Sequence, residues 1–230
     1  MPSLRAVLFA SIVLLAGCAQ VLRTTGNVAA LTSRDGDWFI FLESGKPTPP
    51  DKDAVAKMQA GHIANFARLF AAQKLFAAGP LVDPSGAKRG IVVVKAPDRD
   101  TLRRYFDADE YVRDGYMTLN ARRAVANKPL NTVGIDPKSI EEVRIILLSR
   151  PSVVLDTDTE SNAKAFLQTL VDRGVVGAWY TIEDGPFSEV LFTRITDATR
   201  LDDTGIFVSA TASGSTVAVW RQWLSKGVVK

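Results

Sequence analysis

Two stretches of the chain, Ile91-Val92-Val93-Val94 and Ile145-Ile146-Leu147-Leu148, are apolar at every position. Short apolar runs of this kind predict strands, and a strand with one face in water alternates apolar with polar residues. Neither stretch alternates, so we expect both faces of each strand to be buried. Each half of the chain is therefore predicted to hold a sheet that needs cover on both sides.

The segments around the first stretch follow the order of a ferredoxin-like unit, βαββαβ. Apolar residues spaced by three and four predict a long helix over 53–74, and a shorter helix is expected over 98–106. The turn Asp83-Pro84-Ser85-Gly86 joins two of the strands into a hairpin. The expected strands are 38–43, 75–81, 88–96 and 116–124.

A similar order restarts in the second half, after a connector expected over 131–140. Strands are predicted at 143–148, 175–182 and 189–195, with a helix over 158–173. Alternation predicts another strand over 206–212, and the spacing of Val219, Trp220, Trp223 and Leu224 predicts an extra C-terminal helix over 215–226. The halves, 37–130 and 141–230, are thus expected to be tandem ferredoxin-like units, the second one degenerate.

The two apolar stretches also indicate how the halves meet. The two helices of a ferredoxin-like unit cover only one face of its sheet, so the other face needs a second layer. We expect the open faces of the two sheets to pack together with the helices outside, as an α+β barrel made by one chain. The chain would then be a monomer that acts as a pseudo-dimer. Two separate domains, each with its own cover, are the alternative.

The N-terminal residues predict a lipoprotein signal peptide over 1–17. Arg5 precedes an uncharged apolar run that is too short to span a membrane as a helix, and Leu15-Ala16-Gly17-Cys18 follows it. This tetrapeptide resembles the lipobox of bacterial lipoproteins, which implies cleavage before Cys18 and acylation of that cysteine. With Ala19 next, the resemblance implies a periplasmic protein held in the outer membrane by its lipid, and residues 18–36 form a tether.

Several short motifs of the first half belong together: His62 in Gly61-His62-Ile63, the stretch Ala78-Gly79-Pro80-Leu81 with Asp83, Gly90, and Asp107-Ala108-Asp109-Glu110-Tyr111-Val112. Together they make the region from about 38 to 130 resemble the YCII-related family, small ferredoxin-like proteins of the dimeric α+β barrel group. The resemblance implies a pocket in which His62 and Asp109 face one another. The second half is similar only in order, with Asn162 one hundred residues after His62 and no evident counterpart of Asp109.

His62 is the only histidine in the chain, and the ordinary pKa of histidine lies near neutrality. It is the candidate catalytic residue for proton transfer, with Asp109 holding one ring nitrogen so that the other can act as a general base. Asp107 is an alternative partner. His62 also lies on the inward face of its helix, where a histidine can be structural, and Asp109 can equally cap a helix.

Negative charge that develops on a substrate oxygen could be stabilised by one of three further candidates: the side chain of Tyr111, that of Tyr116, or the backbone at Gly79. Asp83 is assigned to its hairpin turn rather than to chemistry.

Composition and motifs exclude several classes of function. One cysteine and one histidine exclude a disulfide framework, a cysteine-rich zinc site and the common triad and thiol mechanisms, and no phosphate-binding glycine motif is present. The net charge of +3 comes from scattered basic residues, which argues against nucleic acid. No cofactor and no metal are expected. Two functions remain: a lyase, isomerase or hydrolase-like enzyme acting on a small organic molecule, and a non-catalytic, lipid-anchored protein that binds a ligand or a partner.

Overall fold

The computed structural model describes residues 36–152 and 154–230, all within one compact unit of the chain. The first half runs β1 (Gly36–Ser44), α1 (Lys52–Ala71), β2 (Leu75–Val82), β3 (Lys88–Ala96), α2 (Arg99–Arg104), α3 (Glu110–Arg113) and β4 (Met117–Lys128). The second half runs β5 (Asp136–Ser149), α4 (Thr157–Asp172), β6 (Ala178–Ile182), β7 (Phe187–Thr193), α5 (Ala198–Asp202), α6 (Ile206–Ala212) and β8 (Val217–Lys226). The same succession of strands and helical segments therefore occurs twice.

The eight strands close into one antiparallel barrel in the order β1-β3-β2-β8-β5-β7-β6-β4. Within the first half the strands lie in the order β4-β1-β3-β2, and the second half repeats this arrangement as β8-β5-β7-β6. Two seams join the halves: β2 pairs with β8, and β4 pairs with β6. Closure leaves no free sheet edge, which confirms the expected α+β barrel.

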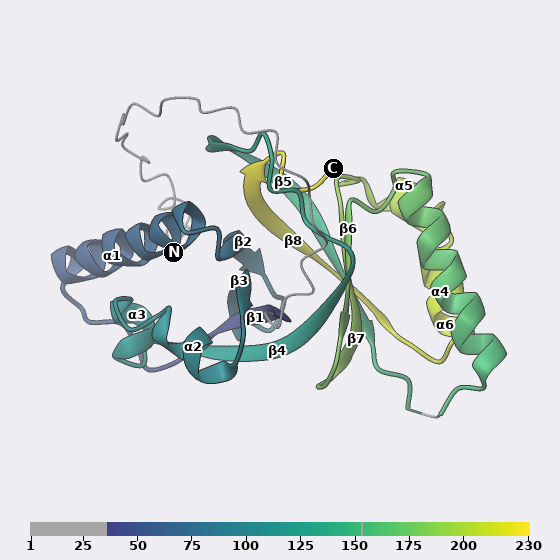
Figure 1. Cartoon of the computed structure of the whole chain (residues 1–230), viewed down its shortest axis with the longest axis horizontal. Coiled ribbons are helices and arrows are strands. Elements are labelled where there is room, and N and C mark those ends of the chain that lie inside the picture. The colour runs from purple at the N-terminus through teal and green to yellow at the C-terminus, as the bar shows by residue number, and fades with distance from the viewer. Residues whose placement is uncertain (1–35, 153) are drawn as a thin grey trace, which may run out of the picture. The chain divides into compact units, whose positions relative to one another are not determined.

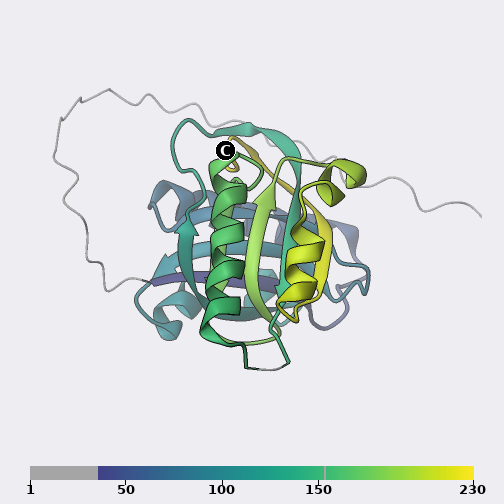
Figure 2. The ribbon, with the colours of Figure 1, turned by 90° about the vertical axis from the view of Figure 1, so that its right-hand side faces the viewer.

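The helices form two layers outside the barrel. In Figure 1, α1, α2 and α3 lie on one side of the strands, and α4, α5 and α6 lie on the other. Figure 2 shows α4 and α6 in front of the strands of the second half. Each helical layer covers the sheet of its own half, as the predicted ferredoxin-like order requires.

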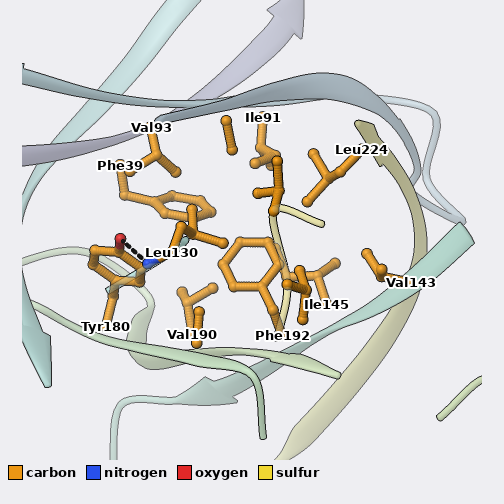
Figure 3. Close-up of a cluster of buried hydrophobic side chains, with 14 of the residues drawn as sticks. Phe39, Ile91, Val93, Leu130, Val143, Ile145, Tyr180, Val190, Phe192 and Leu224 are labelled. Carbon is orange, nitrogen blue, oxygen red and sulfur yellow. Dashed lines mark hydrogen bonds between the residues drawn. The ribbon is translucent and has the colours of Figure 1, made fainter. Parts of the chain in front are cut away.

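The two fully apolar stretches, 91–94 and 145–148, divide their side chains between two environments. Ile91 and Val93 face the barrel interior, whereas Val92 and Val94 pack beneath the helices of the first half. In the second stretch Ile145 and Leu147 face the same interior, and their neighbours pack beneath α4 and α6. Figure 3 shows this shared interior, in which side chains from both halves interdigitate. Both faces of these strands are buried, as predicted.

The C-terminal segment corrects two predictions. Residues 206–212 form helix α6 rather than a strand, because the buried positions are Ile206 and Ala210 while Val208 is exposed. Residues 217–226 form strand β8 rather than a helix, because the barrel needs a strand between β5 and β2. Side chains of β8 alternate accordingly, with Trp220 and Leu224 against the interior and Val219 toward the helices. The second half therefore has no additional C-terminal helix.

The connector is also shorter than expected, because β5 begins at Asp136 and pairs with β8 from that residue onward. The predicted signal peptide, Cys18 and most of the tether lie outside the described residues. Among the helices of residues 36–152 and 154–230, none is both long and apolar enough to cross a membrane.

Candidate functional site

Helix α1 carries the candidate proton-transfer residue on its buried face. Asp51 caps the helix, its side chain accepting a hydrogen bond from the Asp53 amide at 2.9 Å. The buried residues follow at spacings of four, three and four, which places them on one face of the helix: Met58, His62, Asn65 and Leu69. His62 is thus turned toward the rest of the first half, with 7% of its surface exposed.

Asp109 meets this face from the segment before α3. Its Oδ2 lies 2.6 Å from Nδ1 of His62, and its Oδ1 accepts a hydrogen bond from the Tyr111 amide at 3.1 Å. The carboxylate is fully buried. Asp109 therefore caps α3 with one carboxylate oxygen and contacts His62 with the other. Its role as a helix cap and its role as the partner of His62 are compatible. The structure brings Asp109 to His62, whereas Asp107 is exposed.

The contact with Asp109 orients the His62 ring. An ionised carboxylate only accepts hydrogen bonds, so Nδ1 is the ring nitrogen that donates to Asp109 and Nε2 is left for another partner. Phe66 and Tyr111 pack edge-on against the ring, with ring centroids 4.3 and 5.5 Å away. Among the described residues, Nε2 has no hydrogen-bond partner. The imidazole therefore has Asp109, Phe66 and Tyr111 around it, and Nε2 is its nitrogen without a partner among the described residues.

A polar residue that the sequence interpretation missed lies one turn further along α1. Asn65 is 3% exposed, and its Oδ1 accepts a hydrogen bond from Nη2 of Arg68 at 2.7 Å. The same Nη2 also donates to the Tyr105 carbonyl at 2.9 Å, which ties α1 to the chain four residues before Asp109. Within the part of the chain that the structure describes, Nδ2 of Asn65 is buried without a hydrogen-bond partner. The signal was available, because Asn65 lies three residues after His62 and so shares its helix face.

Of the three candidates for oxyanion stabilisation, only Tyr111 contacts His62. Burial raises the pKa of the Tyr111 hydroxyl, so this group stays a neutral donor at physiological pH. Tyr116 instead lies beneath the ammonium group of Lys46, and Gly79 lies at the β2–β8 seam against the backbone of Trp223. Tyr111 and Asn65 are therefore the polar side chains that accompany the pair.

Asp83 lies in the hairpin turn, as expected. Its carboxylate accepts hydrogen bonds from the amides of Ser85 and Lys88, each at 3.0 Å, and from the Ser85 hydroxyl. These bonds satisfy the carboxylate locally, which makes it a turn residue.

The second half has an apolar contact in the corresponding place. Helix α6 begins at Gly205, whose φ is +81°, and no side chain caps it. The Phe166 ring of α4 lies 3.6 Å from the position that a Cβ on Gly205 would occupy. Helix α3 begins instead at the Asp109 carboxylate, which faces His62 on α1. The His–Asp pair is not repeated in the second half, and the described residues contain no cluster of three or more potential metal ligands.

Fold and sequence comparisons agree on the class of protein. The barrel is similar to three solved structures: a heme-binding protein from Thermus thermophilus (12% identity, 83% of this chain and 91% of that chain, TM-score 0.51), a putative monooxygenase from Fusobacterium nucleatum (8%, 85% and 96%, 0.51) and a putative chlorite dismutase (11%, 82% and 94%, 0.50). At these identities the likeness shows the fold alone, that of the α+β barrel proteins.

The sequence comparison identifies the first half more closely. Residues 39–124 match the family model of the YCII-related domain, so this part of the chain is a YCII-related domain. The matched region contains both His62 and Asp109. The match confirms the resemblance to the YCII-related family that the short motifs indicated. No curated protein sequence matches the chain.

Proposed function

We propose that the protein is an acid–base enzyme acting on a small organic molecule, without a cofactor, and that His62 and Asp109 carry the proton transfer. The observation that supports this most directly is the 2.6 Å contact between Nδ1 of His62 and Oδ2 of a fully buried carboxylate. A carboxylate partner of this kind raises the basicity of a general base and fixes its tautomer.

In this proposal each group has one task. Asp109 orients the imidazole and stabilises the positive charge that forms on it. Nε2 of His62 removes a proton next to a carbonyl group, the first step of an isomerisation or an elimination. The neutral Tyr111 hydroxyl and the unpaired Nδ2 of Asn65 are donors suited to the oxygen on which negative charge develops.

The first test is spectroscopic and needs no substrate. Because the chain has one histidine, ¹⁵N NMR of protein purified without a histidine tag reports His62 alone. We expect the Nδ1–H tautomer of the neutral ring, and loss of that preference in Asp109→Ala. Asp98→Ala is the matched control, because Asp98 also caps a helix but is exposed. A wild-type ring in the Nε2–H tautomer would contradict the pair.

The second test is catalytic. A panel of small carbonyl compounds is incubated with the protein in D₂O, and proton NMR follows exchange of the hydrogens next to the carbonyl. We expect exchange of at least one compound, lost in His62→Ala and reduced by about 10²- to 10⁴-fold in Asp109→Asn. Exchange that survives His62→Ala would remove His62 from the mechanism.

A non-catalytic binding protein is the second candidate. Two hollows of the described surface, one at the barrel end beside Phe41 and one beneath α2 and α3, are lined by neither His62 nor Asp109. A protein that binds ligand at one of these places has no need of proton transfer. Binding without exchange in the catalytic test, unchanged in His62→Ala, would favour this function.

We further propose that the protein is a lipoprotein anchored by acylated Cys18, with its body in the periplasm and its lipid in the outer membrane. The support is the Leu15-Ala16-Gly17-Cys18 sequence after a short apolar run. Labelling with an alkyne-bearing fatty acid should mark the wild-type protein and leave Cys18→Ser unmarked, and membrane fractionation locates the product. Equal labelling of Cys18→Ser would refute this assignment.

A further inference from the structure

A hollow of ≈ 280 Å³ lies between α2, α3 and β4, and neither His62 nor Asp109 lines it. Leu119 and Ala121 of β4 contribute its floor, and Leu102 of α2 and Val112 of α3 contribute its walls. Small-molecule sites commonly measure ~300–1,000 Å³ and are mostly apolar. The hollow lies just below this range and combines apolar side chains with two arginines, so it suits a ligand smaller than a typical drug molecule.

The hollow exists because the two helical layers are unequal. In the second half, the seven residues of α6 cover the corresponding strand, and Ile206 and Ala210 pack in one cluster with Val217 and Val219 of β8. In the first half, α3 has only four residues. The outer face of β4 is therefore left partly uncovered at Leu119.

The guanidinium group of Arg99 lies at the rim of the hollow. Arg99 packs over the Trp38 ring at 5.3 Å from the ring centroid and donates to the Ala121 carbonyl at 3.3 Å. Among the described residues it has no carboxylate partner. Arg103, the second basic residue at the rim, has only the exposed Asp100 at 3.8 Å. An exposed guanidinium beside apolar side chains suits an anion with an apolar body.

We propose that this hollow binds a small apolar monocarboxylate, with the carboxylate on Arg99 and the hydrocarbon body against Leu119 and Val112. An apolar cavity of about 150 Å³ can bind benzene, so the hollow has room for a body of one six-membered ring. The site goes beyond the proposed function, because it needs neither His62 nor Asp109.

Benzoate tests the proposal, with benzamide as the uncharged control of the same shape. Binding to the purified protein is followed by ¹⁵N and methyl NMR titration. We expect benzoate to shift the signals of Val112, Leu119 and Ala121, to bind at least tenfold more tightly than benzamide, and to weaken as salt is added. Equal affinity for the two compounds, or shifts confined to other parts of the chain, would overturn the proposal.

Two variants separate the rim from its surroundings. Arg99→Gln should weaken benzoate binding by roughly tenfold or more, because it removes a charge-assisted hydrogen bond. Arg104→Gln changes the same charge on the same helix but lies outside the hollow, so it should leave the affinity unchanged. An unaltered amide spectrum elsewhere shows that each variant is folded. Undiminished benzoate binding in Arg99→Gln would overturn the proposal. His62→Ala should bind benzoate with the affinity of the wild type, whether or not His62 is catalytic.

Discussion

Replacing Phe192 by alanine tests whether the two halves share one interior. Phe192 lies on β7 of the second half, is fully buried, and has its ring centroid 6.3 Å from that of Phe39 on β1 of the first half. A buried Phe→Ala change costs about 3–5 kcal/mol, through lost transfer free energy and the cavity that remains. Because the cavity would open between the halves, both should lose stability together.

Hydrogen–deuterium exchange followed by mass spectrometry measures this loss separately in each half. A cost of about 3–5 kcal/mol corresponds to exchange between about a hundredfold and several thousandfold faster at amides that exchange only by global unfolding. We expect that acceleration in β7 and equally in β3, which holds Ile91 and Val93 in the first half.

Phe70→Ala is the matched control, because Phe70 is 39% exposed on α1. It should cost no more than about 1 kcal/mol. Acceleration in β7 with unchanged exchange in β3 would show that the halves have separate cores, and the reasoning from the apolar stretches would be refuted.

Three further predictions concern single positions. Burial raises the pKa of Glu189 above its ordinary value of 4.5, so the stability that its protonated form contributes is lost as the pH rises above that value. Glu189→Gln should therefore become more stable relative to wild type as the pH rises, and urea unfolding at a series of pH values measures this; a constant difference would contradict it. A Cβ on Gly79 would lie 1.9 Å from the Trp223 carbonyl oxygen, so Gly79→Ala should separate β2 from β8. It should lower the free energy of unfolding, measured in urea, by about 1–3 kcal/mol. An unchanged unfolding midpoint would show that the β2–β8 pairing adjusts to the added methyl group. The Tyr180 hydroxyl accepts a 3.0 Å hydrogen bond from the Leu130 amide inside the barrel, so Tyr180→Phe should cost about 1–3 kcal/mol by the same measurement; a wild-type midpoint would mean that the amide finds another partner (Figure 3).

The fold was largely predictable because burial on two faces leaves a mark in the sequence. Ile91–Val94 shows no alternation, and the structure places Ile91 and Val93 in the interior and the other two beneath the helices. The C-terminal segment was not predictable in the same way. Trp220, Trp223 and Leu224 are spaced as on a helix, but pairing with two neighbouring strands outweighs that local pattern.

The candidate site was predicted in its residues but not in its geometry. His62 and Asp109 are 47 residues apart, and periodicity places each on its own element without bringing them together. The choice between Asp107 and Asp109 depends on which carboxylate begins α3 and faces α1, and the three-dimensional path of the chain decides it. Asn65 was missed, although its spacing from His62 places both on the buried face of α1.

The amino-acid pattern alone requires that two sheets are each covered on both faces, because burying hydrophobic residues at consecutive strand positions removes apolar surface from water. It also supplied the only imidazole in the chain. Three features became visible only in the folded chain: the partner of that imidazole, the strand β8, and the hollow over β4. Each of these depends on contacts between residues far apart in the chain, and local patterns carry no information about which distant surfaces meet.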